Sequence, residues 1–281
     1  MESIYEVAKA EYDARLPDEA QRLDRYRQVL EPYIYHYLIE RHSPTLNGFW
    51  VQFQPPKTAK HAFVIVERRP HPNFAFILKN IAWADPTNAV YLFCSDINYP
   101  FIKALLGDKE LHYNIIVAFQ GLGTREQGKA DYNRLLTSPA FYQQLNAEHI
   151  VTVQMDAFFR RRLPPQFYTG DYWGNPWAWR LAAPGGGGIT VRRVAKMIEL
   201  CTQFPQDHRH CDNEDSWLSD RILQTRGEFP PLFERAEAIM ESLPAINPYS
   251  LHQFWTFLEQ YMVKPRDHVI GYWTDLLNLI T

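Results

Sequence analysis

Between residues 62 and 156 the chain alternates short apolar runs with longer amphipathic segments, and this alternation constrains the fold more than any other feature of the sequence. The apolar runs have strand length: AFVIVE (62–67), AVYLFCSD (89–96), HYNIIVAFQ (112–120) and HIVTVQMD (149–156). Segments of helical length separate them: 73–84, 98–107 and 128–145, the last with a break at Pro139. Strands that alternate with helices predict an α/β layer with a largely parallel sheet.

Polar residues stand where these predicted strands end. They are Glu67 and Arg68, Ser95 and Asp96, Gln120, and Gln154 and Asp156. In parallel α/β sheets, ligands bind beyond the carboxyl ends of the strands. The sequence therefore predicts a ligand site at this edge of the sheet.

The flanking segments are less regular. Residues 1–43 carry apolar residues at helical spacing, with a helix start between Pro17 and Asp18, and residues 43–60 are loop-like. We therefore expect an N-terminal helical extension over 1–60 and the main domain over 61–281. Within that domain, the expected elements are an ordered loop region (167–188), a strand leading into a helix (189–204), a helix with an acidic start (208–227), a helix (229–243), and a turn followed by an aromatic helix (247–262).

Composition narrows the class of protein. The net charge of −3 lacks the basic excess of a nucleic-acid binder. The three cysteines are scattered and form no CxxC pair, which argues against a disulfide framework or thiolate zinc and favours a reducing compartment. The N-terminus is charged from its second residue, and no run approaches 18 apolar residues, so neither a secretory signal nor a membrane span is expected. We expect a soluble enzyme of the cytoplasm or another intracellular space.

Each candidate chemical residue also has a plain structural interpretation. Asp156 after a strand suits a Mg²⁺ or Mn²⁺ ligand or an ordinary turn. The glycines of PGGGGIT (184–190) suit a close approach to a ligand or a flexible linker. The acids of CDNEDSWLSD (211–220) suit a general base or a helix start. HRH (208–210) is interpreted as a loop, and a lone His252 is usually structural.

The order of these motifs is more specific than any one of them. With the stretches VIVERRPHPNFAFILKNI, YNRLLTSPAFYQQL, VTVQMDAFFR, YWGNPW, GGGGITVRRVAKMIELC, NEDSWLS and PYSLHQFW, the chain resembles nucleotide-sugar glycosyltransferases of the GT-A fold over about residues 62–258. More narrowly, it resembles a poorly characterised glycosyltransferase-like domain family of bacteria, fungi and large DNA viruses, which would place a viral member in the host cytoplasm. The resemblance implies a Rossmann-like, mostly parallel sheet flanked by helices.

The resemblance also implies roles for individual residues. Asp156 and His252 would hold Mn²⁺ or Mg²⁺ on the donor diphosphate, and Asp215, with Glu214 as the alternative, would be the base of an inverting transfer from a nucleoside-diphosphate sugar, a UDP-sugar, to a glycan or other hydroxyl acceptor. Donor contacts would come from Glu67, Arg68, Asp96, Tyr132, Asn133, Arg134, Gln154, Gly187 and Gly188, within a loop from Gly185 to Gly188. Trp173, Trp177 and Trp179 would stack on the acceptor sugar.

One position departs from the family pattern. The usual acid-x-acid metal motif is Gln154-Met155-Asp156 here, so the first acid is an amide that adds no charge. This amide and the many aromatic residues leave open a catalytically inactive protein that binds a sugar or nucleotide. A third interpretation is a nucleotidyltransferase, but that class usually has several acids at one metal site and a Gly-rich loop soon after the first strand, where this chain has ERRPHPN (67–73). The sugar, the acceptor and the oligomeric state are not specified by the sequence.

Overall fold

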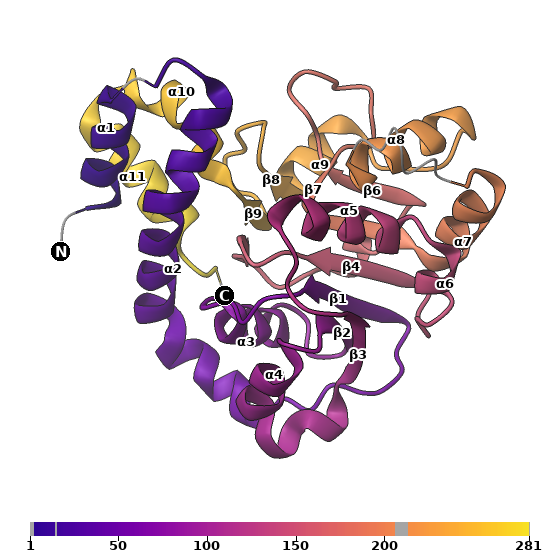
Figure 1. Cartoon of the computed structure of the whole chain (residues 1–281). Helices are drawn as coiled ribbons and strands as arrows, with labels where there is room; N and C mark the ends of the chain where they lie inside the picture. The colour runs from indigo at the N-terminus through magenta and orange to yellow at the C-terminus, as the bar shows by residue number, and fades with distance from the viewer. Residues whose placement is uncertain (1–2, 15, 206–212, 281) are drawn as a thin grey trace.

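A six-stranded sheet forms the centre of the computed structural model, which describes residues 3–14, 16–205 and 213–280 (Figure 1). The strand order is β3-β2-β1-β4-β7-β6. The bounds are β1 (His61–Glu67), β2 (Ala89–Ser95), β3 (Asn114–Phe119), β4 (His149–Val153), β6 (Tyr172–Asn175) and β7 (Gly186–Arg193). Strand β1 pairs in parallel with β2 and β4, and β2 with β3, whereas β7 is antiparallel to both β4 and β6. The prediction of an α/β domain with a mostly parallel central sheet flanked by helices is confirmed.

Helices cover both faces of this sheet because both faces are apolar. Strands β2 and β4 are buried along their whole length, as expected for strands covered on two sides. Alternate residues of β1 enter different cores: Phe63 and Ile65 on one face, Ala62 and Val64 on the other. The first face packs on α3 (Phe74–Ala84) and α4 (Tyr99–Leu106). The second packs on α5 (Arg125–Leu136), α6 (Pro139–Tyr142), α7 (Val194–Gln203) and α8 (Glu214–Gln224).

The N-terminal helices are α1 (Ile4–Asp13) and α2 (Glu19–Gln52). Asp18 begins α2 as predicted, since its carboxylate accepts the backbone N–H groups of Ala20 and Gln21. The loop expected over 43–60 is confirmed only for residues 53–60, because α2 continues through Pro44 to Gln52. The buried face of α2 continues to Leu46 beyond this proline, so tertiary packing outweighs the helix-breaking tendency of proline.

The second half also differs from the prediction in detail. The expected loop region 167–188 contains the short helix η2 (Pro165–Phe167) at its start, then β6 and the beginning of β7. Strands β6 and β7 approach each other so closely that a Cβ on Gly174 would lie 2.5 Å from the carbonyl oxygen of Gly186. This close approach explains why glycine occupies these positions. The helix predicted over 229–243 is shorter: α9 (Leu232–Ala238) leads directly into strand β8 (Ile239–Met240).

A second, three-stranded sheet lies beside the first and has the order β5-β9-β8. Its outer strand β5 (Ala157–Phe159) follows β4, and its central strand β9 (Ser250–His252) precedes the short helices η4 (Phe254–Phe257) and α10 (Leu258–Met262). The remaining elements are η1 (Gly107–His112), between α4 and β3, and the C-terminal α11 (Arg266–Leu276). Because β5 and β9 are neighbours, the end of β4 and the end of β9 meet.

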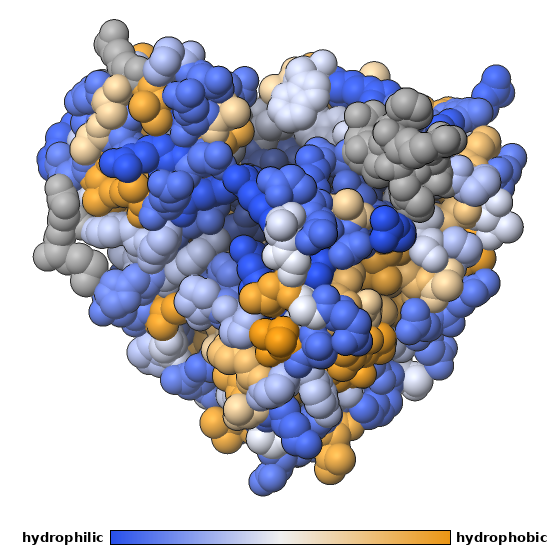
Figure 2. Space-filling view, in the orientation of Figure 1, coloured by the Kyte–Doolittle hydropathy of each residue, from blue (hydrophilic) through white to orange (hydrophobic). Residues whose placement is uncertain are grey.

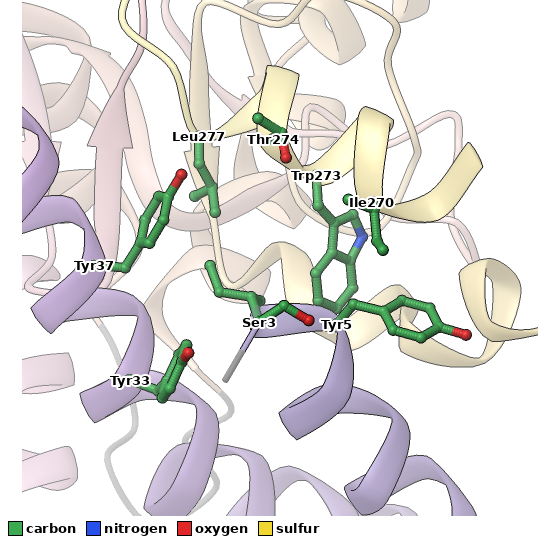
Figure 3. A pocket seen from close by; sticks show the side chains of 9 residues that line it. Ser3, Tyr5, Tyr33, Tyr37, Ile270, Trp273, Thr274 and Leu277 are labelled. Carbon is green, nitrogen blue, oxygen red and sulfur yellow. The ribbon is translucent and has the colours of Figure 1, made fainter. Parts of the chain in front are cut away.

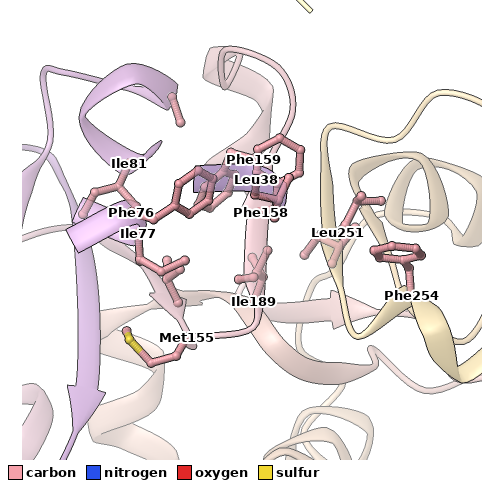
Figure 4. Close-up of a cluster of buried hydrophobic side chains, with 14 of the residues drawn as sticks. Leu38, Phe76, Ile77, Ile81, Met155, Phe158, Phe159, Ile189, Leu251 and Phe254 are labelled. Carbon is pink, nitrogen blue, oxygen red and sulfur yellow. The ribbon is translucent and has the colours of Figure 1, made fainter. Parts of the chain in front are cut away.

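The first 60 residues share a core with the rest of the chain. Helix α2 contributes Leu38 to a cluster that also contains Phe158 and Phe159 of β5 and Leu251 of β9 (Figure 4). The N-terminal helices also meet the C-terminal ones: Arg22 pairs with Glu259 of α10 (Figure 1). No helix among the described residues is both long and apolar enough to cross a membrane.

A small pocket lies between α1, α2 and α11 and is lined mainly by aromatic and aliphatic side chains (Figure 3). Its volume is about 190 Å³. Tyr5, Tyr37 and Trp273 are among its lining residues, and none of the predicted site residues is. Figure 2 shows a different feature, a hollow lined by hydrophilic residues between the α1–α2–α10 lobe and the side of the molecule that carries α5 and α8.

Candidate functional site

Asp156 and His252, predicted together as metal ligands, are neighbours in the structure. The antiparallel pairing of β5 with β9 sets Ala157 opposite His252, so the preceding residue, Asp156, reaches the histidine ring. The His252 Nε2 atom lies 3.1 Å from Asp156 Oδ1. The other carboxylate oxygen, Oδ2, accepts a 2.5 Å hydrogen bond from the amide of Gln253. The site therefore forms where the large and the small sheet meet.

Glu241, which follows β8, completes this group and was not predicted from the sequence. Its Oε2 atom lies 2.7 Å from His252 Nδ1 and accepts a 2.7 Å hydrogen bond from Asn175. In the sequence Glu241 belonged to a stretch expected to be helical, and only the turn into β8 directs it to His252. We call Asp156, Glu241 and His252 the open cluster.

The charges of the open cluster stabilise one another. Burial alone would lower the pKa of His252, but the two carboxylates on either side raise it well above its ordinary value. Burial alone would raise the pKa of Asp156, but the charge of His252 and hydrogen bonds from His252 and Gln253 hold it well below its usual range. The cluster therefore consists of a histidine ring held between two carboxylates.

Two atoms of the open cluster have no partner except each other. Asp156 Oδ1 and His252 Nε2 are both shielded from solvent and face each other as an ion pair at 3.1 Å. Two ligand atoms that bind one cation at about 2.1 Å and at right angles are about 3 Å apart. The atoms thus fit a shared divalent cation, with Glu241 orienting the histidine through Nδ1. Among the described residues, no group of three or more His, Cys, Asp or Glu converges on one metal position.

The glycine segment (Gly185–Gly188) fits against the acidic and histidine side chains of the site. A Cβ on Gly186 would come within 2.5 Å of Asp215 Oδ2, and one on Gly188 within 2.2 Å of the His252 ring. The N–H of Gly187 donates a 3.1 Å hydrogen bond to Asp215 Oδ2. Any side chain here would displace these groups, so the glycines are required for packing as well as for access.

Asp215 and Glu214 lie in different environments at the start of α8. Glu214 is buried and its Oε1 accepts a 3.2 Å hydrogen bond from Arg192, which also donates to Tyr142. Burial and the charge of Asp215 raise the pKa of Glu214 to about 7 despite Arg192. We call Arg192, Glu214 and Tyr142 the paired cluster. Asp215 is only half-buried and is directed toward the glycine segment.

Three of the residues predicted to contact the nucleotide sugar lie in the hydrogen-bond network around these acids. The amide of Gln154 donates a 3.1 Å hydrogen bond to the hydroxyl of Tyr132, and its backbone N–H donates to the carbonyl of Gly188. The side chain of Asn133 is buried and accepts the N–H of Glu214, so it fixes the start of α8. Gln154, Tyr132 and Asn133 are therefore near the acids, and each already has a protein partner.

The other residues predicted to contact the nucleotide sugar bind protein groups outside the open cluster. Glu67 binds the guanidinium of Arg69, and Arg134 pairs with Asp131 on the surface of α5. Arg68 is buried and donates to Asp131 and to the carbonyls of Gln120 and Gly121. Asp96 is exposed and accepts the N–H of Gly121. Arg68 and Asp96 order the loop between β3 and α5. Contact of Glu67, Arg68, Asp96 and Arg134 with a nucleotide stays a prediction.

Of the three tryptophans expected to stack on an acceptor sugar, one is buried alone and two form a stacked pair. Trp173 is 2% exposed and its indole N–H donates to the carbonyl of Thr169, so the prediction of sugar stacking is wrong for this residue. Trp177 and Trp179 stack on each other, with ring centroids 5.9 Å apart, and Trp179 is 74% exposed. Residues 208–212, which include the HRH segment and Cys211, lie outside the described residues.

Comparison with known proteins finds similar sequences and structures, but no match shows the family to which the chain belongs. The family described as "Protein of unknown function (DUF5672)" matches residues 124–246, which is less than half of the chain. No curated protein matches.

Solved structures with a similar fold include glycosyltransferases. The glycosyltransferase GlyE of Streptococcus pneumoniae TIGR4, in its apo form, is 10% identical, with a TM-score of 0.45 over 77% of this chain. The match spans 63% of the GlyE chain, less than two thirds. Mouse xyloside xylosyltransferase 1, also in its apo form, is 10% identical, with a TM-score of 0.45, over 68% of this chain and 96% of that one. These values describe distant similarity of fold and assign no substrate or activity to the chain.

Proposed function

We propose that this chain is a glycosyltransferase that moves a sugar from a nucleoside-diphosphate sugar, a UDP-sugar, to a hydroxyl of a glycan or similar acceptor, with inversion and with the help of a divalent cation. One observation carries the proposal: the buried atoms Asp156 Oδ1 and His252 Nε2, which pair only with each other, lie beside the glycine segment, which also touches the carboxylate of Asp215. A cation-binding pair and a half-buried carboxylate along one segment without side chains suit transfer between two bound substrates.

Asp156 and His252 would hold Mn²⁺ or Mg²⁺. The bound cation would supply positive charge that stabilises the departing diphosphate. With a cation on Nε2, the remaining proton of His252 would lie on Nδ1, which is 2.7 Å from Glu241 Oε2. Gln154 adds a hydrogen-bonding amide beside Asp156 without adding charge, and it is itself oriented by Tyr132.

Asp215 suits the role of general base better than Glu214. Glu214 is buried and engaged by Arg192, whereas Asp215 is half-buried at the glycine segment. Asp215 would accept the proton of the acceptor hydroxyl as that oxygen bonds to the anomeric carbon and the bond from this carbon to the diphosphate oxygen breaks. The N–H groups of Gly187 and Ser216 orient the two oxygens of Asp215 for this task. Glu214 then acts as a positioning residue.

The nucleotide would lie over the carboxyl ends of β1, β2 and β3. There Arg68 and Asp96 hold the loop that precedes α5, and this loop would form the wall of the nucleotide site. On the acceptor side, the exposed ring of Trp179, supported by Trp177, offers a flat apolar surface of the kind on which sugars stack.

The test is hydrolysis and transfer from a panel of UDP-, GDP- and CMP-sugars with and without Mn²⁺. We expect turnover with one nucleotide, and a loss of kcat of about 10²–10⁴-fold in Asp215→Asn with nucleotide binding retained. Asp220→Asn, on the same helix with its side chain 50% exposed, is the matched control. Turnover that survives in Asp215→Asn would remove this residue as the base. Nucleotide binding without turnover in any combination would favour an inactive binding protein instead.

A further inference from the structure

One face of α2 runs along the chain segment that carries Asp156. The residues of this face, Glu31, Tyr35, Leu38 and His42, follow each other at helical spacing. The ring of His42 stacks on Phe158 at 5.6 Å, and Leu38 lies beside the same residue in Figure 4. Toward the N-terminus, the ring of Tyr35 meets the ring of His71 edge-on at 5.7 Å, and Asn73, which is bound to His71, donates a 2.6 Å hydrogen bond to the carbonyl of Met155, the residue before Asp156. This face of α2 therefore passes the chain segment that carries Asp156.

Glu31, one helical turn before Tyr35, is at the site end of this face. Its side chain is 15% exposed, and its Oε1 atom is shielded from solvent and makes no hydrogen bond. The nearest cationic atom, Arg27 Nε, is 3.8 Å away, too far for a hydrogen bond. Burial and the charge of Asp156 raise the pKa of Glu31 to about 7, and the charge of His252 also acts on it. Glu31 is thus electrostatically part of the site.

Unpaired buried atoms come from three separate elements here. Glu31 Oε1 on α2, Asp156 Oδ1 after β4 and His252 Nε2 at the end of β9 all lack both solvent and a hydrogen-bond partner. His252 is only 3% exposed. Buried polar atoms without partners are rare because each one costs free energy. A ligand that reached both the Asp156–His252 pair and Glu31 would remove this cost.

We propose that Glu31 is a positioning residue of the cation site, accepting hydrogen bonds from water molecules bound to the divalent cation that Asp156 and His252 hold. This inference rests on the cation site of the proposed function. Contact through water agrees with the absence of a three-residue ligand group among the described residues. It also suits Mg²⁺ and Mn²⁺ chemistry, because small hard cations retain several water ligands.

Charge supports the same assignment. The neutral Gln154 leaves Asp156 as the single carboxylate in direct position to balance a doubly charged cation. Glu31 adds a further carboxyl group from helix α2. The N-terminal helix then belongs to the functional site, and residues 1–60 contribute chemistry as well as packing.

The test is Mn²⁺ binding, measured by calorimetry and by electron paramagnetic resonance on the whole chain without any substrate. We expect Glu31→Gln to weaken Mn²⁺ binding by about 10–100-fold, the effect typical of residues that orient metal ligands. We expect Glu40→Gln to bind Mn²⁺ like the wild type, because Glu40 is on the same helix with its side chain 50% exposed. Glu31→Gln also loses the increase in melting temperature that Mn²⁺ gives the wild type.

Each outcome separates this inference from the proposed function. If the wild type binds Mn²⁺ and Glu31→Gln binds it as tightly as Glu40→Gln does, the role of Glu31 is overturned while the site of Asp156 and His252 stands. If the wild type and Asp156→Asn both fail to bind Mn²⁺, the cation site itself fails, and the inference fails with it. Should Glu31→Gln not fold, Glu31→Asp replaces it, since it keeps the charge and shortens the reach. Weaker Mn²⁺ binding by Glu31→Asp supports the inference, and wild-type affinity overturns it.

Discussion

Strand β7 carries two buried charged clusters that differ in how completely their atoms are paired. At its start, Gly187 and Gly188 touch the open cluster, where Asp156 Oδ1 and His252 Nε2 lack hydrogen bonds. Farther along, Arg192 anchors the paired cluster, in which all three guanidinium nitrogens have partners. One strand therefore holds a closed charge network and an incomplete one a few residues apart.

The difference separates residues that stabilise the fold from residues that await a ligand. A closed network of buried charges holds its neighbours in place, and removing one member leaves another charge without a partner. In an incomplete network, buried polar atoms without hydrogen bonds already lower the stability of the folded protein. A bound cation or substrate would pair these atoms and raise that stability. We therefore expect substitutions in the paired cluster to affect stability first, and substitutions around the open cluster to affect ligand binding.

The largest effect on stability is expected for Arg192→Met. The substitution keeps an apolar stem of similar length but leaves the carboxylate of Glu214 buried without its cation. Breaking one side of a buried pair typically costs about 3–5 kcal/mol. Urea unfolding at pH 7 should show this loss as a lower midpoint with an unchanged slope.

The double variant Arg192→Met/Glu214→Gln is the control for this expectation. It removes the uncompensated charge as well as its partner, so it should recover part of the lost free energy of unfolding. If Arg192→Met alone unfolds at the wild-type urea concentration, the paired cluster contributes no stability and the contrast between the clusters is lost.

Sequence periodicity was sufficient to predict the four parallel strands of the sheet and the helices between them, although not β6. Apolar runs of strand length and intervening amphipathic segments are local features, and the buried strands β1, β2, β3 and β4 follow from them directly. The end of helix α2 was not predictable in this way. Its last turns contain Pro44 and Gly48, which predict a loop, and only the contacts of Leu46 with the rest of the core keep them helical.

Only part of the candidate site could be predicted from the sequence. Asp156, Asp215 and His252 were expected from their motif order, and the structure brings Asp156 to His252 and Asp215 to the glycine segment. Glu241 and Glu31 carry no local signal, because each resembles any other charged residue of a helical segment. Their position depends on the turn into β8 and on the packing of α2, which are long-range features.

An intermediate effect is expected for Gly188→Ala, which tests whether the open cluster depends on the glycine segment. A Cβ at this position would lie 2.2 Å from His252 Cδ2, so the imidazole has to move away from Asp156 and Glu241. We expect a loss of about 3 kcal/mol in the free energy of unfolding, at the upper end of overpacking costs, together with loss of Mn²⁺ binding. Thermal unfolding and calorimetric titration measure the two effects separately.

Gly271→Ala sets the baseline for that comparison. Gly271 lies within α11 with no atom within 4 Å of the added Cβ, so alanine should raise stability by about 0.5–1 kcal/mol through helix propensity. It should leave Mn²⁺ binding unchanged. Wild-type Mn²⁺ affinity in Gly188→Ala would show that the position of His252 does not matter for binding, which contradicts the assignment of the open cluster.

The smallest effect, and the one that depends on pH, is expected for Glu214→Gln. Burial raises the pKa of Glu214 from its ordinary value of 4.5 to about 7, so the folded protein binds this proton more tightly than the unfolded chain does. Stability from this group is therefore complete below pH 4.5 and is lost as the pH rises toward 7. Such a shift corresponds to at most about 3 kcal/mol, and relaxation around the pair with Arg192 brings the expected change to about 1–2 kcal/mol.

Glutamine cannot titrate, so the stability of Glu214→Gln relative to the wild type should rise across this pH range and then level off above pH 7. Urea unfolding at a series of pH values from 4.5 to 8 measures the difference, with Glu234→Gln as the control because Glu234 is an exposed residue at the start of α9. A difference that stays constant with pH would mean that Glu214 is ionised throughout and that Arg192 fully compensates its burial. The paired cluster would then be a conventional ion pair, and its contrast with the open cluster would rest on the hydrogen bonds alone.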